Sequence, residues 1–190
     1  MERMETNFWE IPNILTIARV AAIPVMVVLL CFPGKLASFL AAVFFVLAGA
    51  TDFLDGFLAR RRRLVSRFGK FMDPLADKLL VSAALIMLIP LNRVPAWMAF
   101  VIVGRELAVT GLRALAATEG IILAPDRWGK TKTLLQMLAL ATLILHYPYL
   151  TLEFDRLGLG LLWLAMIVTV ASGASYFLTF FRQYPESRQP

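Results

Sequence analysis

Two pairs of aspartates are the residues of this chain best suited to chemistry. Asp52 and Asp55 follow one apolar run, and Asp73 and Asp77 open the next. Spacings of three and four residues place each pair on one face of a helix, so two helices joined by a short turn can aim all four carboxylates at one point. Carboxylates beside lipid are unfavourable and usually mark a functional site. Because four together repel unless cations neutralise them, we expect a divalent-metal site, and oxygen-only ligation suits Mg²⁺ or Mn²⁺ rather than Zn²⁺.

The residues between the two pairs extend this pattern, which reads D-x2-D-G-x2-A-R-x8-G-x3-D-x3-D. Gly56 and Ala59 are small enough to let a ligand approach the helix backbone closely. Arg60 can neutralise a phosphate or bind it through hydrogen bonds. Gly69 allows a tight turn between the two aspartate pairs. Capping or solvation explains a single aspartate at a helix end, but four at this spacing favour a site.

Long apolar blocks surround the pattern. Of the 190 residues, 59% are hydrophobic, against about 45–50% in an average soluble domain, and the mean hydropathy is +0.74. A membrane-spanning helix needs about 20 mostly apolar residues. We therefore expect an all-α integral membrane bundle that forms one domain over residues 1–190. Its six transmembrane helices are expected at 14–32, 36–60, 71–91, 95–118, 130–147 and 158–181.

Charge gives the expected orientation. The net charge is +6, from 19 lysines and arginines against 13 acids. One set of helix ends carries Arg3, Arg61, Arg62, Arg63, Arg67, Lys70, Arg127, Arg182 and Arg188, whereas the other carries Lys35, Arg93 and Arg156. The positive-inside rule places both termini and the turn between the aspartate pairs in the cytoplasm. Basic residues confined to helix ends argue against nucleic acid as a partner. The segment before Ile14 is expected to form either a short interfacial helix or a frayed tail.

The sequence resembles a known family at these same positions. The run from Asp52 to Arg60, followed by Gly69, Asp73 and Asp77, is similar to the signature of the CDP-alcohol phosphatidyltransferases. Further likeness is to the bacterial branch that uses sn-glycerol 3-phosphate. It lies in Pro12-Asn13-Ile-Leu15-Thr16-Ile-Ala-Arg19, Phe68-Gly69-Lys-Phe71-Met-Asp73-Pro74-Leu-Ala76-Asp77-Lys78, Gly104-Arg105-Glu106-Leu with Leu112-Arg113, and Gly129-Lys130-Thr-Lys132-Thr133 with Gln136.

The resemblance implies a reaction and roles for residues. Two metal ions hold the diphosphate of CDP-diacylglycerol, the primary hydroxyl of glycerol 3-phosphate attacks phosphorus, and CMP leaves. Asp52, Asp55 and Asp73 correspond to metal ligands, and Asp77 corresponds to a general base that also touches a metal. The small and basic residues of the signature would contact CDP-diacylglycerol; they are Gly56, Ala59, Arg60 and Gly69. The family also implies a homodimer in the bacterial inner membrane.

The phosphate of glycerol 3-phosphate needs a basic pocket. Its expected residues are Arg105, Arg113, Lys130 and Lys132. Arg105 is the strongest of these because it lies deep in a helix, where an ion pair with an acid is the alternative; Lys130 and Lys132 also fit as positive-inside charges. Arg19 and Lys78 are expected either to balance the acids or to reach phosphate. Asn13 and Thr16 share a face with Arg19, which suits site lining and polar helix packing equally. Glu106 is expected to point elsewhere, as a structural partner.

Other functions remain open at this stage. A sister enzyme would take inositol phosphate, serine or phosphatidylglycerol as acceptor, and the 52–77 signature does not separate these. A cation transporter also places carboxylates in the membrane, but here the acids gather at one face and we expect the last three helices to hold none at the midplane. A metal-dependent prenyltransferase would use paired aspartates in a larger bundle without the D-G-x2-A-R segment. A purely structural membrane protein leaves the four aspartates unexplained.

Overall fold

The computed structural model describes residues 11–62, 67–121, 128–148 and 153–184, without the side chains of 11–13, 15, 52–62, 67–71 and 128–130. All regular structure in these residues is helical. The six helices are α1 (Ile11–Leu30), α2 (Lys35–Arg62), α3 (Arg67–Leu88), α4 (Ala96–Thr118), α5 (Trp128–Leu145) and α6 (Phe154–Gln183). The all-α expectation and its six helices are confirmed. α1 begins at Ile11 rather than at the expected 14, and residues 1–10 of the expected N-terminal segment lie outside the described residues. α6 begins before the expected 158 because Asp155 in its first turn is favourable at a helix N-terminus.

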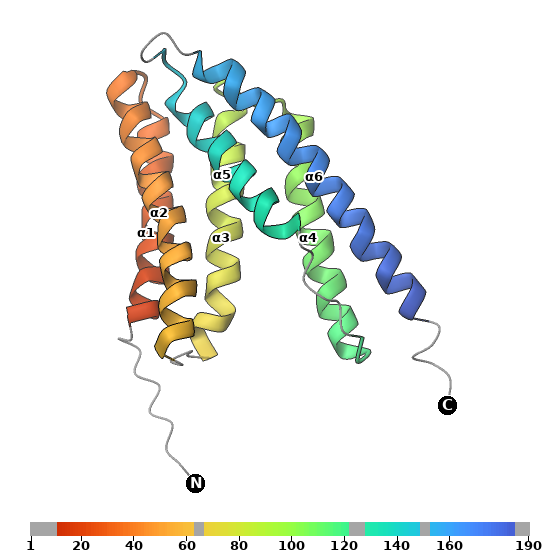
Figure 1. Ribbon diagram of the computed structural model, residues 1–190. Coiled ribbons are helices and arrows are strands. Elements are labelled where there is room, and N and C mark those ends of the chain that lie inside the picture. The colour runs from red at the N-terminus through yellow and green to blue at the C-terminus, as the bar shows by residue number, and fades with distance from the viewer. Residues whose placement is uncertain (1–10, 63–66, 122–127, 149–152, 185–190) are drawn as a thin grey trace, which may run out of the picture.

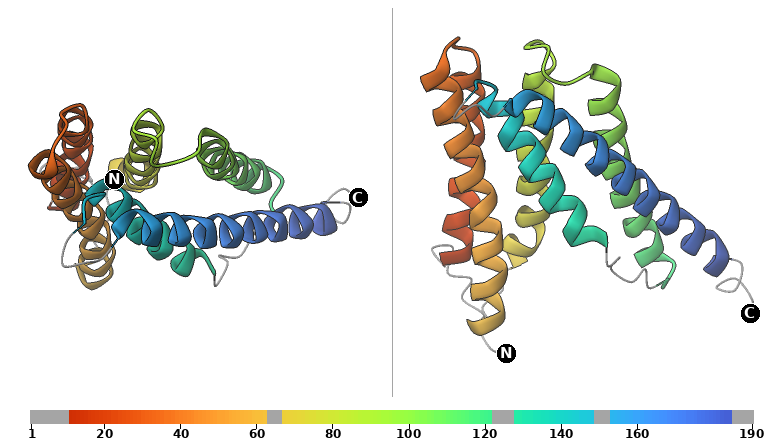
Figure 2. Two further views of the ribbon diagram at one scale, coloured as in Figure 1. Left: turned by 90° about the horizontal axis from the view of Figure 1, so that it is seen from above. Right: turned by 45° about the horizontal axis from the view of Figure 1, so that its top comes forward.

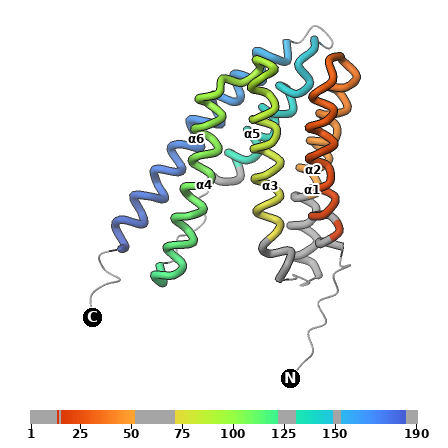
Figure 3. The backbone as a smooth tube through the Cα atoms, turned by 180° about the vertical axis from the view of Figure 1, so that it is seen from behind, coloured from red at the N-terminus to blue at the C-terminus, as the bar shows by residue number. Residues whose placement is uncertain are grey.

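The helices run alternately up and down, so that α1 begins and α6 ends at the same end of the bundle (Figure 1). We call this the aspartate end, because α2 passes to α3 there; the opposite end holds the α1–α2, α3–α4 and α5–α6 links. α1 packs on α2 and α3, α5 packs on α6, α2 and α3, and α4 packs on α6 and, less extensively, on α3. α3 and α4 diverge toward the aspartate end, as Figures 1 and 3 show from two sides.

The core lies where α2, α3, α4 and α5 meet. Phe45, Leu85, Met98 and Leu140 are fully buried there. Seen from above, α5 and α6 lie along one side of the bundle, and α3 and α4 along the other (Figure 2). The outer surface also carries many large apolar side chains, and each of the six helices exposes at least one of them. Helices that are apolar on every face suit a membrane better than water.

Length and composition single out one helix. Within the described residues, α6 is the one helix long and apolar enough to cross a bilayer, with 30 residues and a mean hydropathy of 2.0 in its most apolar window. Shorter apolar stretches occupy Thr16–Leu30, Lys35–Thr51 and Thr131–Leu145. Six helices are thus established, and one of them meets the criterion for a spanning segment.

Small residues let α6 approach its neighbours closely. A Cβ atom at Gly158 would lie 2.7 Å from both Leu143 Cγ and Thr142 Oγ1 on α5. Farther along α6, a Cβ atom at Gly173 would lie 3.0 Å from Arg105 Cγ and Nε on α4. Close helix contacts through small residues are typical of membrane bundles, where packing replaces hydrophobic burial as the driving force.

An arginine clamps the opposite end of the bundle. Arg93, in the α3–α4 link, donates through one guanidinium nitrogen to the carbonyls of Leu143, at 3.2 Å, and Ile144, at 3.0 Å, and through the other to Ser38 Oγ at 3.5 Å. The last carbonyls of a helix have no partner within the helix, so Arg93 satisfies acceptors that α5 leaves open. Burial lowers the pKa of Arg93, while the nearby charge of Asp155 opposes that shift.

Replacing Arg93 with methionine should therefore destabilise the bundle. The variant keeps much of the apolar stem but leaves buried acceptors without a donor, which costs about 1–3 kcal/mol. Thermal unfolding in detergent micelles would show a lower Tm. Arg156→Met is the matched control, since the Arg156 side chain is 86% exposed and pairs with Glu153 on the same helix; such surface changes stay within about 0.5 kcal/mol. Equal Tm values for the two variants would contradict the clamp.

Candidate active site

α3 places two of the four aspartates on one helix face near the aspartate end. Asp73 and Asp77 lie in the first half of α3, four residues apart, and both are partly buried. Asp73 Oδ1 accepts a hydrogen bond from the hydroxyl of Thr16 on α1, which is 1% exposed. A carboxylate among apolar helices needs such donors or cations around it. This contact places the Thr16 hydroxyl beside Asp73, which fits both roles expected for Thr16, site lining and polar helix packing.

The other two aspartates, Asp52 and Asp55, lie on α2. Their side chains are outside the described residues. The structure likewise describes only the backbone at Gly56, Ala59, Arg60 and Gly69. α2 ends at Arg62 and α3 begins at Arg67, and the two helices contact each other. The backbone therefore brings both predicted pairs to the same end of the bundle. Whether all four carboxylates converge stays a prediction, as does the metal.

Arg19 joins α1 to α2 just before the first aspartate pair. Its side chain is 1% exposed, and its Nε donates to Ala48 O at 3.1 Å and to Thr51 Oγ1 at 3.4 Å. The Thr51 hydroxyl in turn donates to Ala48 O at 2.6 Å. Arg19 therefore places a positive charge immediately beside the segment that carries Asp52. Asn13, expected on the same face, has its side chain outside the described residues.

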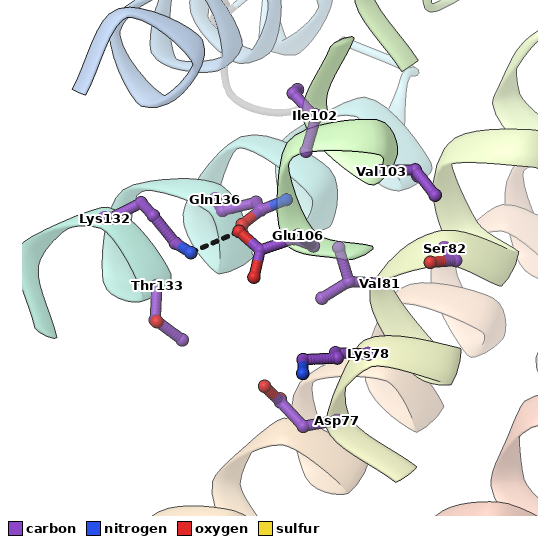
Figure 4. Close-up of a pocket in the computed structure, with 10 residues that line it drawn as sticks. All are labelled: Asp77, Lys78, Val81, Ser82, Ile102, Val103, Glu106, Lys132, Thr133 and Gln136. Atoms are coloured by element: carbon purple, nitrogen blue, oxygen red, sulfur yellow. Dashed lines mark hydrogen bonds and ion pairs between the residues drawn. The ribbon is translucent and has the colours of Figure 1, made fainter. Parts of the chain in front are cut away.

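A recess opens to solvent between α3, α4 and α5. Asp77 and Lys78 contribute from α3, Glu106 from α4, and Lys132 and Gln136 from α5, and Figure 4 shows them around one space. The remaining lining residues are Val81, Ser82, Ile102, Val103 and Thr133. The recess thus combines the predicted base with one predicted phosphate-binding lysine.

Glu106 occupies the centre of this arrangement, contrary to the prediction that it points elsewhere. Its Oε1 accepts from Lys132 Nζ and pairs with Arg105 Nη1 at 3.0 Å. It also lies in the middle of α4, one of the last three helices, which were expected to hold no acid at the membrane midplane. The prediction assumed that Glu106, as the neighbour of Arg105 in the sequence, must point away from the site. A glutamate side chain is long enough to contact both Arg105 on its own helix and Lys132 on α5. Paired with two cations, Glu106 is tolerated at this depth.

Arg105 lies behind the recess and braces α4 against α6. Its Nη2 donates to Ser172 Oγ at 2.8 Å, and its stem lies against Gly173. The ion pair with Glu106 is the alternative that the sequence left open for this arginine. Its Nε is buried and has no hydrogen-bond partner in the described part of the chain. Lys132, not Arg105, is therefore the predicted phosphate ligand that faces the recess.

The remaining basic residues are spread more widely. Arg113 is exposed, with its guanidinium carbon 6.0 Å from the centre of the Tyr176 ring on α6. The side chain of Lys130 lies outside the described residues. Lys78 donates to Thr110 Oγ1, and Thr110 donates to the Glu106 carbonyl at 2.7 Å. Lys78 therefore links α3 to α4 across the recess.

Sequence reasoning did not select Gln136 as a site residue, although it lines the recess. It follows Lys132 by four residues on α5, so both face the same way. Gln136 is 4% exposed, and its Nε2 has no hydrogen-bond partner among the described residues. A polar side chain one turn from a predicted ligand, inside an apolar helix, was the available signal.

Comparisons with known proteins identify the family of this chain. A family model described as CDP-alcohol phosphatidyltransferase matches residues 9–171. The CDP-diacylglycerol–glycerol-3-phosphate 3-phosphatidyltransferase of Bacillus subtilis (strain 168) is 44% identical over 182 residues, covering 89% of this chain and 94% of the relative. The protein of that name from Rickettsia bellii is 44% identical over 168 residues, covering 88% and 93%. One from Arabidopsis thaliana, whose name ends in 2, is 37% identical over 193 residues, covering 90% and 80%. The matched segment contains all four aspartates and the recess, and this chain belongs to the CDP-alcohol phosphatidyltransferase family.

Proposed function

We propose that this protein transfers the phosphatidyl group of CDP-diacylglycerol to sn-glycerol 3-phosphate, giving phosphatidylglycerol phosphate and CMP. The observation that carries the proposal is the recess in which Asp77 of α3 faces Lys132 of α5. A carboxylate at one side suits removal of a hydroxyl proton, and an ammonium at the other suits a phosphate. The names of the relatives state this reaction for those proteins and support it here.

The aspartate end suits divalent metal. Asp73 and Asp77 offer oxygen donors on one face, and α2 brings Asp52 and Asp55 to the same end. Such donors fit Mg²⁺ or Mn²⁺, and the family resemblance implies two ions held by Asp52, Asp55, Asp73 and Asp77. When bound, the ions would neutralise the charge that builds on the diphosphate as CMP leaves. Thr16 keeps the Asp73 carboxylate oriented toward that task.

Asp77 is the proposed general base. Its place on α3 at the recess lets it accept the proton of the primary hydroxyl of glycerol 3-phosphate. That hydroxyl oxygen then forms a bond to the phosphorus carrying diacylglycerol, and the bond from phosphorus to the CMP oxygen breaks.

The membrane arrangement is part of the same proposal. Six helices with apolar outer faces would span the bacterial inner membrane, with the aspartate end and both termini in the cytoplasm, where CMP is released. A cation transporter is less suitable, because Glu106, the acid found at depth, is paired with Lys132 and Arg105. The homodimer implied by the family resemblance stays a prediction.

Cysteine labelling tests the orientation. In a Cys31→Ser background, which removes the chain's single cysteine, Glu153→Cys places a thiol at the opposite end, and Val65→Cys places one in the α2–α3 link. A membrane-impermeant maleimide added to sealed cells should label position 153 directly. Position 65 should react only after the cells are permeabilised. The reverse pattern would invert the proposed topology.

Asp77→Asn tests the base. This variant keeps the size and polarity of the side chain but accepts no proton, so the rate of CMP release should fall by about two to four orders of magnitude. Binding of CDP-diacylglycerol should change little, because proton removal affects only the chemical step. Asp155→Asn is the control, since Asp155 pairs with His146 at the opposite end. Turnover within a few-fold of the wild type would assign the base elsewhere.

Lys132→Met tests the phosphate contact. The variant keeps the buried stem and removes the charge, so the KM for glycerol 3-phosphate should rise about tenfold or more, while that for CDP-diacylglycerol stays nearly constant. Lys35→Met, at the opposite end, is the matched control. Arg105→Met should have the smaller effect on that KM, because Arg105 lies behind the recess. A larger effect at Arg105 would restore the order expected from the sequence.

A further inference from the structure

α6 is connected to the recess by a chain of polar contacts. Ser172 Oγ on α6 accepts a hydrogen bond from Arg105 Nη2 at 2.8 Å. The other terminal nitrogen of that guanidinium, Nη1, pairs with Glu106 Oε1 at 3.0 Å. The same Glu106 oxygen accepts from Lys132 Nζ on α5, a contact that Figure 4 marks with a dashed line. Three contacts thus connect a hydroxyl on α6 to the ammonium that the proposed function assigns to the acceptor phosphate.

The pair between Arg105 and Glu106 depends on how the arginine side chain is held, because adjacent residues on a helix do not face each other. A guanidinium is planar, and its N–H groups have fixed directions relative to one another. When Ser172 holds Nη2, the direction of Nη1 is therefore restricted as well. The arginine stem runs beside Gly173, where a Cβ atom would lie 3.0 Å from both Cγ and Nε of Arg105. A hydroxyl and a missing side chain on α6 together favour the orientation in which Arg105 meets Glu106.

These contacts are largely shielded from water. Ser172 is 5% exposed, and the side chains of Arg105 and Lys132 are 12% and 10% exposed. Hydrogen bonds that involve charged groups are strong in such surroundings. Because one Glu106 oxygen is shared by two cations, a displacement of Arg105 would also move the acceptor that holds Lys132. Among the described residues that line the recess, none belongs to α6, so α6 affects the recess through this chain of contacts.

We propose that Ser172 and Gly173 position Lys132 for the phosphate of the acceptor, acting through Arg105 and Glu106. This inference rests on the proposed function, because it names the residues that set the affinity of that phosphate contact. The competing role for the two residues is structural, as a packing contact between α4 and α6. A structural role would affect both substrates alike, whereas a positioning role would affect the phosphorylated acceptor alone.

Ser172→Ala tests the first contact of the chain, because it removes the hydroxyl with little change in volume. The readout is CMP release from CDP-diacylglycerol. The KM for sn-glycerol 3-phosphate should rise about three- to tenfold, as expected for one lost hydrogen bond, while kcat and the KM for CDP-diacylglycerol stay nearly constant. Ser175→Ala is the matched control, since Ser175 is exposed on the same helix, and it should keep the wild-type KM values.

Gly173→Ala reaches the same guanidinium by a different route. The added methyl group would displace the Arg105 stem without removing a hydrogen-bonding group. The KM for glycerol 3-phosphate should again rise, and the KM for CDP-diacylglycerol should not. Gly160→Ala is the matched control, because a Cβ atom at Gly160 has no packing neighbour within 4 Å.

A Lys132→Met background identifies the route of the effect. If Ser172 acts through Lys132, Ser172→Ala should raise the KM for glycerol 3-phosphate no further once the ammonium is absent, since residues in one network are not additive. A full additional rise in that background would overturn the inference. Equal increases in both KM values, or an unchanged KM for glycerol 3-phosphate in either α6 variant, would also overturn it, with the proposed function intact. A wild type that releases no CMP with glycerol 3-phosphate would instead refute the proposed function, and the inference with it.

Discussion

Placing charges between apolar helices is the constraint on which this structure depends. A charged group removed from water is strongly unfavourable unless a partner compensates it. In the described part of the chain, the deep charges accordingly come with partners from other helices: Arg19 with α2, Asp73 with α1, and Glu106 with α5. These contacts do more than neutralise charge. Each one joins two helices that the apolar surfaces alone would allow to slide past each other.

The same contacts explain why the recess has its shape. Glu106 holds Lys132 from α5 and Arg105 from its own helix, and Arg105 continues to Ser172 on α6. Lys78 reaches from α3 to Thr110 on α4. Four helices are therefore connected by polar contacts around one space. A binding site built this way is held by residues that also hold the fold, which keeps reacting groups in place.

Much of the fold could be predicted from the sequence, because its signals are local. Three links between helices are marked by Pro33-Gly34, by the segment from Pro90 to Pro95, and by Pro148. The two basic turns mark the other two links, so all five fall where the sequence predicts them. The aspartate pattern placed Asp73 and Asp77 on one helix face for the same reason. Helical periodicity depends only on near neighbours in the chain.

The contacts between helices could not be predicted, because they depend on which helices become neighbours. Apolar helix surfaces of similar shape do not specify the neighbours. Thr16 and Asp73 are 57 residues apart, and Glu106 and Lys132 are 26 apart. No local spacing predicts that these pairs meet. The same limit explains the ranking of the basic residues: depth in a helix made Arg105 prominent, but the position of α6 decided that it would face Ser172 rather than the recess.

The α3–α4 link has a mechanical consequence for the recess. These two helices are joined by a short segment at the opposite end, where Arg93 is clamped, and they diverge toward the aspartate end. Any tilt of α4 about this link would have its pivot near Ala96 of that helix. Glu106 lies ten residues along it, which is about 15 Å from the pivot at 1.5 Å per residue. A tilt of about 4° would move Glu106 by about 1 Å relative to Asp77, an amount that already matters for reacting groups. The Arg93 contacts at this link therefore oppose such a tilt from the far end of the bundle, and the Arg105–Ser172 contact opposes it farther along α4.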